Sequence, residues 1–88
     1  MMSKQRKTLK DVFLHPAHSG IRWADIESLF IALGATVTEA EGSRITVILN
    51  DVYAVFHRPH PRPTADKGSV RSVKRFLTNA GVAPDEHT

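Results

Sequence analysis

The chain has 88 residues, of which 41% are hydrophobic, and a formal net charge of +3. A chain this short buries roughly 60% of its unfolded surface, so we expect one compact core and no separate cofactor domain. The lack of cysteine excludes disulfides and thiolate metal sites. No run of about 18 apolar residues predicts a membrane span, and no apolar signal core follows the basic N-terminus. We therefore expect a cytoplasmic protein.

Positive charge is concentrated in two segments of the chain. Residues 1–10 carry four cations and no acid, whereas acids outnumber cations in residues 11–57. In residues 58–75, six cations face one acid, Asp66: they are Arg58, Arg62, Lys67, Arg71, Lys74 and Arg75. Such segregation creates a local potential that attracts phosphates. The alternative is a solvated basic face without a partner.

Two helices are predicted in the N-terminal half. Thr8 followed by Asp11 resembles an N-cap with an acid at N3, which predicts a short helix over residues 9–14, ended by Pro16. Residues 1–20 therefore form a basic N-terminal extension. A second helix is predicted by apolar residues at helical spacing, with Gly34 as its left-handed C-terminal cap. Its apolar stripe consists of Trp23, Ile26, Leu29, Phe30 and Leu33.

Three strands are predicted between residues 35 and 57. Residues 35–39 are rich in β-forming residues, and a turn at residues 41–43 leads into residues 44–49, where the side chains alternate. Asn50 and Asp51 tolerate positive φ, which predicts a two-residue hairpin loop before a third strand over residues 52–57. Counting back from this loop pairs Arg44 with His57. The alternation assigns Tyr53 to the outer face of the sheet.

The C-terminal third is predicted to hold an extended loop and a helix. Residues 58–68 contain three prolines. Gly68 or Ser69 then opens a helix that Gly81 closes. Its buried stripe consists of Val70, Val73, Phe76, Leu77 and Ala80, and Arg71, Lys74 and Arg75 repeat the same spacing on the opposite face. We assign Trp23, Phe30, Phe56 and Phe76 to the core.

The predicted order is α-β-β-β-α with a short extra N-terminal helix. Two helices packed on one face of a three-stranded antiparallel sheet would bury all of these stripes. This α+β arrangement is that of a double-stranded-RNA-binding domain. We expect the domain to span residues 21–82 and residues 83–88 to form a frayed tail.

A family resemblance lies in the C-terminal two thirds of the chain. Gly42-Ser43 is followed by a hairpin, by the run FHRPHP at residues 56–61 and by KGSVRSVKRFLTNAGV at residues 67–82. Over about residues 22–82 the chain resembles the HicA toxins of HicAB toxin–antitoxin pairs. The resemblance implies cleavage of messenger RNA and neutralisation by a HicB-type antitoxin that covers the site. The family's catalytic histidine follows the Gly-Ser pair by one or two positions, where this chain has Arg44 and Ile45.

His57 and Arg44 are the candidate catalytic pair. Metal-free cleavage of RNA needs a base that deprotonates the 2′-hydroxyl and a cation that stabilises the transition state. His57 suits the first task and Arg44 the second. Their predicted cross-strand pairing would bring the Cβ atoms to about 5 Å from each other. The alternative is that His57 is a strand-end residue that contacts only phosphate or an antitoxin.

Residues of the loop and of the last helix are candidates for binding RNA phosphates. They are Arg58, His60, Arg62, Lys67, Ser69, Arg71, Lys74 and Arg75. Gly68 and Ser69 are expected to offer free N–H groups to an anion at the helix N-terminus. Contacts of this kind are electrostatic and salt-sensitive. The same cations could instead pair with acids of an antitoxin.

No metal or cofactor is predicted. His57 with His60, and His15 with His18, have no carboxylate or cysteine in a spacing that would complete a metal site. Three functions remain open. The first is a metal-independent endoribonuclease that acts on mRNA. The others are a non-catalytic RNA or DNA binding module of the same fold, and an interaction protein whose basic face binds an acidic partner.

Overall fold

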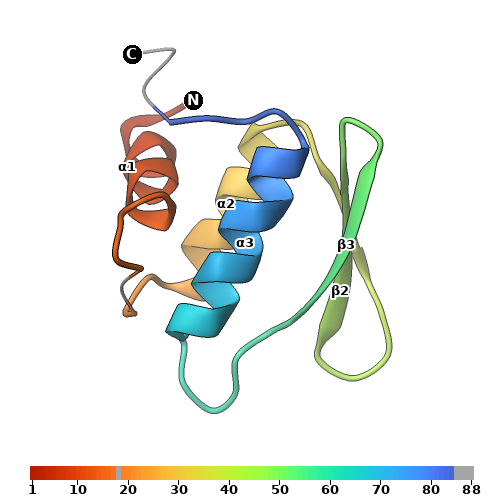
Figure 1. Ribbon diagram of the computed structural model, residues 1–88. Coiled ribbons are helices and arrows are strands. Elements are labelled where there is room, and N and C mark those ends of the chain that lie inside the picture. Colours follow the sequence, from red (N-terminus) through yellow and green to blue (C-terminus); the bar gives the residue numbers. More distant parts are fainter. Residues whose placement is uncertain (18, 85–88) are drawn as a thin grey trace.

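The computed structural model describes residues 1–17 and 19–84. Its elements are α1 (Ser3–Val12), α2 (Trp23–Ala32), β1 (Thr36–Glu39), β2 (Arg44–Leu49), β3 (Val52–His57) and α3 (Lys67–Asn79). The strands form one antiparallel sheet in the order β1-β2-β3. Figure 1 shows α2 and α3 between this sheet and α1. The predicted α+β architecture, that of a double-stranded-RNA-binding domain, is confirmed.

Two parts of the prediction fall outside this description. His18, one half of a histidine pair weighed as a metal site, and the last four residues of the predicted tail are not among the described residues. Within the described ranges, no helix is long and apolar enough to cross a membrane.

The first helix begins earlier than predicted. α1 covers Ser3–Val12, so the basic N-terminal residues lie on the helix instead of preceding it. Thr8 is buried within α1, and its hydroxyl donates a hydrogen bond to the carbonyl of Lys4. An N-cap side chain would instead accept a bond from the next turn. The predicted start at residue 9 is therefore wrong. Ser and Thr side chains can either cap a helix or bond to a carbonyl of the preceding turn, and Thr8 does the second.

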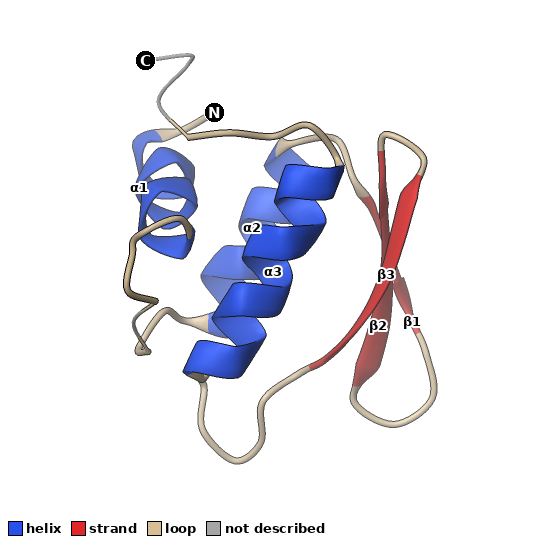
Figure 2. Cartoon of the chain, viewed as in Figure 1, coloured by secondary structure: helices blue, strands red, loops and turns tan. Residues whose placement is uncertain are grey.

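The hydrophobic core lies between the sheet and the pair α2 and α3, two layers that Figure 2 separates by colour. At its centre are four buried aromatic side chains: Trp23, Phe30, Phe56 and Phe76. Their neighbouring ring centroids lie 5.6 to 6.0 Å apart. Truncation of a buried aromatic residue costs about 3–5 kcal/mol. The assignment of these four residues to the core is thus confirmed. The cluster joins α2, β3 and α3 and holds in place the end of β3 that carries His57.

The β2–β3 hairpin has the predicted bounds and register. Asn50 and Asp51 have φ values of 50° and 68°, as a two-residue loop with positive φ at both positions requires. Arg44 is the Cα partner of His57 at the other end of the hairpin. Tyr53 is exposed on the outer face, as predicted. The register follows because less exposed and more exposed side chains alternate along each strand.

The loop after β3 is attached to the segment that precedes α2. The N–H of Trp23 donates to the carbonyl of Pro63 at 2.9 Å, and the N–H of Ala65 donates to the carbonyl of Ile21 at 2.8 Å. Ala65 is buried, whereas residues 60–62 are exposed. The His15-Pro16 and His60-Pro61 peptide bonds are cis. The loop lacks helix and strand, as predicted, but it is not extended throughout: it bends at residues 60, 61 and 63 and is held at its C-terminal half.

Candidate functional site

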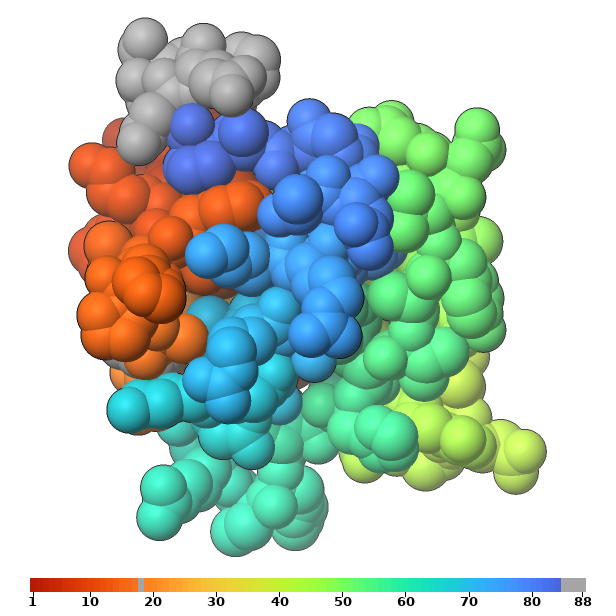
Figure 3. All heavy atoms as spheres, viewed as in Figure 1, coloured from red at the N-terminus to blue at the C-terminus, as the bar shows by residue number. Residues whose placement is uncertain are grey.

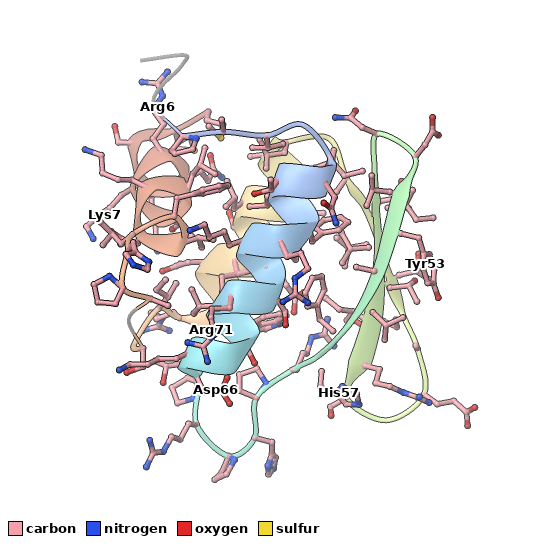
Figure 4. All side chains as sticks on the ribbon, viewed as in Figure 1. Arg6, Lys7, Tyr53, His57, Asp66 and Arg71 are labelled. Carbon is pink, nitrogen blue, oxygen red and sulfur yellow. The ribbon has the colours of Figure 1, made fainter. Side chains whose placement is uncertain are left out.

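A histidine and an arginine face the same side of the sheet where the β2–β3 hairpin opens. His57 and Arg44 are paired across the strands, and both are exposed. The Nε of Arg44 donates to the carbonyl of Glu41 at 3.2 Å, which holds the guanidinium near the turn between β1 and β2. Figure 4 shows His57 where β3 runs into the loop toward α3. The predicted pairing thus exists, at the end of the sheet nearest that loop.

His57 also lines a groove between β3 and the N-terminus of α3. The groove has a volume of about 460 Å³. Val55 and His57 border it on β3, and Gly68, Ser69 and Ser72 border it on α3. His57 and the first turns of the basic helix therefore border one concave surface, although nine residues of loop separate them in the sequence.

The N-terminus of α3 is capped by an acid of the same chain. The carboxylate of Asp66 accepts a hydrogen bond from the N–H of Ser69 at 2.7 Å. This bond is the main cause that holds the pKa of Asp66 below its ordinary value, and the charge of Arg71 adds to it. The predictions that Gly68 or Ser69 opens the helix, and that the N–H of Ser69 is free for an anion, are wrong. Asp66 already occupies the capping position, where the helix dipole also favours a negative charge.

The cations of α3 do not form one continuous stripe. Lys67, Arg71 and Arg75 are exposed, and Figure 4 shows Arg71 projecting from the front of the helix. Lys74 is half-buried, with its Nζ 5.9 Å from the centroid of the Phe13 ring. A helical wheel of α3 could not reveal this contact, because it depends on how the residues after α1 pack. Lys74 is therefore less accessible to a phosphate than the other three cations.

Arg58 follows His57 but turns toward the helices. Its guanidinium donates to Glu27 of α2 at 2.7 and 3.1 Å and to Glu39 of β1 at 2.7 Å twice. The bonds to Glu27 and then to Glu39 raise the pKa of Arg58, and its hydrogen bond lowers the pKa of Glu39. The donors of this guanidinium are thus directed at carboxylates. We assign Arg58 a structural role in place of the predicted phosphate contact.

The two remaining candidates lie outside the groove. His60 and Arg62 are in the exposed part of the loop after β3 and are not among the residues that line the groove beside His57. The structure therefore pairs His57 with Arg44 across the strands and places His57 at the groove that reaches the first turns of α3. His60, Arg62 and Arg58 do not line this groove. Glu27 and Glu39 were missed by sequence reasoning, because they lie 31 and 19 residues from Arg58.

These features define a small α+β domain of the double-stranded-RNA-binding type, with a basic helix beside an exposed histidine. A model of the family described as the HicA toxin of bacterial toxin–antitoxin systems matches residues 23–82. The chain therefore belongs to the HicA toxin family, as the sequence motifs indicated. Membership makes it a toxin of a toxin–antitoxin system and implies an antitoxin partner. Comparison with curated proteins and with solved structures found no match.

The family match covers the sheet, α2 and α3 but not α1. It begins at the first residue of α2 and ends next to Gly81, where the N–H of Val82 donates to the carbonyl of Leu77. α1 packs on α2 and contacts α3 on the side away from the sheet. The N-terminal helix is thus an addition to the family domain that leaves the sheet face open.

Proposed function

We propose that this toxin is a metal-independent endoribonuclease that cleaves messenger RNA and is neutralised by a HicB-like antitoxin. Family membership supports the toxin and the antitoxin partner. The RNA substrate is supported by the exposed cations of α3. The proposal depends above all on one observation, the pairing of His57 with Arg44 beside the groove that reaches α3.

In the proposed reaction, His57 acts as the general base. Its imidazole takes the proton of a ribose 2′-hydroxyl, and the 2′-oxygen then attacks the adjacent phosphorus. The bond from phosphorus to the 5′-oxygen breaks, and that oxygen takes a proton from solvent. The guanidinium of Arg44 stabilises the negative charge that develops on the phosphoryl oxygens. The products are a 2′,3′-cyclic phosphate and a 5′-hydroxyl.

The position of His57 supports its replacement of the family histidine. Of the two residues that follow the Gly42-Ser43 pair, Arg44 is exposed and Ile45 is fully buried. Arg44 thus stands at the accessible position, and His57 is its direct partner on β3. The imidazole is displaced by one strand spacing, about 4.8 Å. In this proposal, Lys67, Arg71 and Arg75 hold the RNA backbone through salt-sensitive phosphate contacts.

The test is the cleavage rate of His57→Ala on a messenger RNA, together with growth arrest after induction. Loss of a general base is expected to lower the rate by about 10²–10⁴-fold. The exposed position of His57 predicts an unchanged circular dichroism spectrum. His60→Ala is the matched control, because it removes an exposed imidazole outside the groove and should leave cleavage intact. Cleavage by His57→Ala at the wild-type rate would refute the assignment.

A non-catalytic binding module is the second candidate, and the arginine at the family histidine's position favours it. Such a module would retard RNA in a gel without shortening it, and His57→Ala would change neither result. The enzyme would produce fragments that carry cyclic phosphate ends. A protein that recognises only an acidic partner would neither shift nor cleave the RNA.

A further inference from the structure

β3 is an open edge of the sheet. It is the last strand in the order β1-β2-β3. The N–H of Arg58 donates to the carbonyl of Ser43 at 2.8 Å, so residues of the same parity on β3 bond to β2. The alternation of an antiparallel ladder then directs the N–H and C=O groups of Tyr53, Val55 and His57 away from β2. Within residues 1–17 and 19–84, these three have no backbone hydrogen bond to a loop or helix.

The two edges of the sheet differ in how well they are protected against pairing with a strand of another chain. β1 has four residues and ends at Glu39, which takes part in the ion pair with Arg58. β3 has six residues, runs without a bulge against β2 and contains neither proline nor an acidic, lysine or arginine residue. Natural edge strands are commonly protected by charges, prolines, bulges or shortness. β3 has none of these protections and is therefore suited to accept another strand.

The surroundings of this edge specify the side chains of an added strand. On the outer face, Ile48, Tyr53 and Val55 are 45%, 63% and 44% exposed, and Ile48 is the cross-strand partner of Tyr53. On the inner side, a groove of about 250 Å³ separates β3 from Ser72, Arg75 and Asn79 of α3. Figure 3 shows β3 in green and α3 in blue next to one another on one face of the molecule. Because side chains alternate along a strand, apolar residues would meet Tyr53 while acidic residues would meet Arg75.

We propose that the antitoxin adds an extended segment of alternating apolar and acidic residues to the open edge of β3. Main-chain bonds to Tyr53, Val55 and His57 would supply affinity, and Arg75 would select the acids. The segment would cover the groove beside His57 and exclude RNA from it. This inference rests on the antitoxin partner of the proposed function and does not depend on catalysis by His57.

Two other occupants fit the edge less well. A second copy of this chain would bring β3 against β3 and offer no acid to Arg75, because β3 contains none. It would also place two copies of the basic helix near each other. A single strand of RNA would contact the cations, but its backbone lacks the regularly spaced N–H and C=O groups of a paired β-strand.

The proposal is tested by amide hydrogen exchange of the wild-type toxin, free and with its cognate antitoxin. Exchange of the Tyr53, Val55 and His57 amides is expected to slow at least about tenfold in the complex. Unchanged exchange of these amides would overturn the proposal. So would their protection by RNA alone, or a concentration-dependent dimer that protects them without antitoxin.

A comparison of Val55→Pro with Val55→Ala provides a second test. Proline removes the backbone N–H that points away from β2, whereas alanine shortens the side chain and retains this N–H. Val55→Pro is expected to weaken antitoxin binding at least about tenfold more than Val55→Ala. Equal affinities of the two variants would contradict strand addition. The wild-type exchange measurement decides the matter if Val55→Pro fails to fold. A His57→Ala variant that cleaves RNA at the wild-type rate, while antitoxin still protects the Tyr53 and Val55 amides, would refute catalysis by His57 and leave strand addition standing.

Discussion

His57 and Arg58 follow one another at the end of β3, yet their side chains lie on opposite faces of the sheet. His57 is exposed on the outer face beside Arg44, whereas Arg58 turns inward and bonds to Glu27 and Glu39. A carboxylate that already accepts from a guanidinium competes with phosphate for the same donors. A cluster of basic residues in the sequence therefore overstates the charge that a ligand can reach.

The cations of α3 also differ in whether a ligand can reach them. Arg75 is exposed at the groove along β3, whereas Lys74 is half-buried over Phe13. Adjacent residues on a helix point about 100° apart, so one turns to the open side and the other toward α1. Exposed cations and cations engaged within the fold should therefore respond differently to mutation.

The largest difference is expected in RNA affinity. The double variant Arg71→Gln, Arg75→Gln removes two exposed cations from α3 and should weaken RNA binding by about 100-fold at low salt. The slope of log affinity against log salt should become shallower by about 1.4. Arg6→Gln, Lys10→Gln on α1 is the matched control, because it removes the same charge from exposed positions outside the groove. Equal losses in the two double variants would mean that only net charge matters.

A moderate effect is expected on stability. Arg58→Ala should lower the free energy of unfolding by about 1–2 kcal/mol, because charge-assisted bonds are lost and solvent screens the Glu39 side. For a chain of this size the melting temperature should fall by about 5–15 °C. Arg58→Lys should recover part of this loss, since lysine keeps the charge but cannot bond both carboxylates in a fork.

The control for this prediction is Arg44→Ala. Arg44 is exposed, and among the described residues its side chain bonds only a turn carbonyl, so the melting temperature of Arg44→Ala should differ little from that of the wild type. Calorimetry of the three variants measures the contrast. An Arg44→Ala variant as unstable as Arg58→Ala would contradict the division between the two faces.

The smallest effect is expected on the melting temperature when the pH is lowered. The pKa values of Glu39 and Asp66 lie below their ordinary values of 4.5 and 3.8, because of bonds to Arg58 and Ser69. A carboxyl whose pKa is lower in the folded state stabilises the fold above its unfolded pKa and loses that contribution as pH falls through its folded pKa. The melting temperature should therefore decrease below about pH 4.5.

The two variants Arg58→Ala and Asp66→Asn locate the source of this acid sensitivity. Arg58→Ala should show a shallower fall, because Glu39 then has an ordinary pKa. Asp66→Asn retains a residue that caps helices but cannot titrate, so it should also be less sensitive to acid. Scanning calorimetry between pH 6 and pH 3 measures both. A fall as steep as that of the wild type in both variants would assign the acid sensitivity to other carboxyls.

Local signals in the sequence specify the order of the elements and the register of the hairpin, although not where the first and last helices begin. Alternation with a period of two leaves one core-facing choice for β2 and β3, and Asn50-Asp51 sets where the chain reverses, so the pairing of Arg44 with His57 could be counted in advance. Glycines at the helix ends and apolar residues at helical spacing are equally local signals. The family motifs are likewise short runs of consecutive residues that can be read directly from the sequence.

Tertiary structure alone decided which cations remain accessible. Arg58 meets Glu27 and Glu39, and Lys74 meets Phe13, through contacts between residues that are distant in the sequence. The role of Asp66 was also missed in the sequence, because an aspartate before a helix can be a surface charge or the helix cap. A periodic pattern says which face of an element is polar. The packing of other elements decides whether an ion or a carboxylate of the same chain reaches that face first.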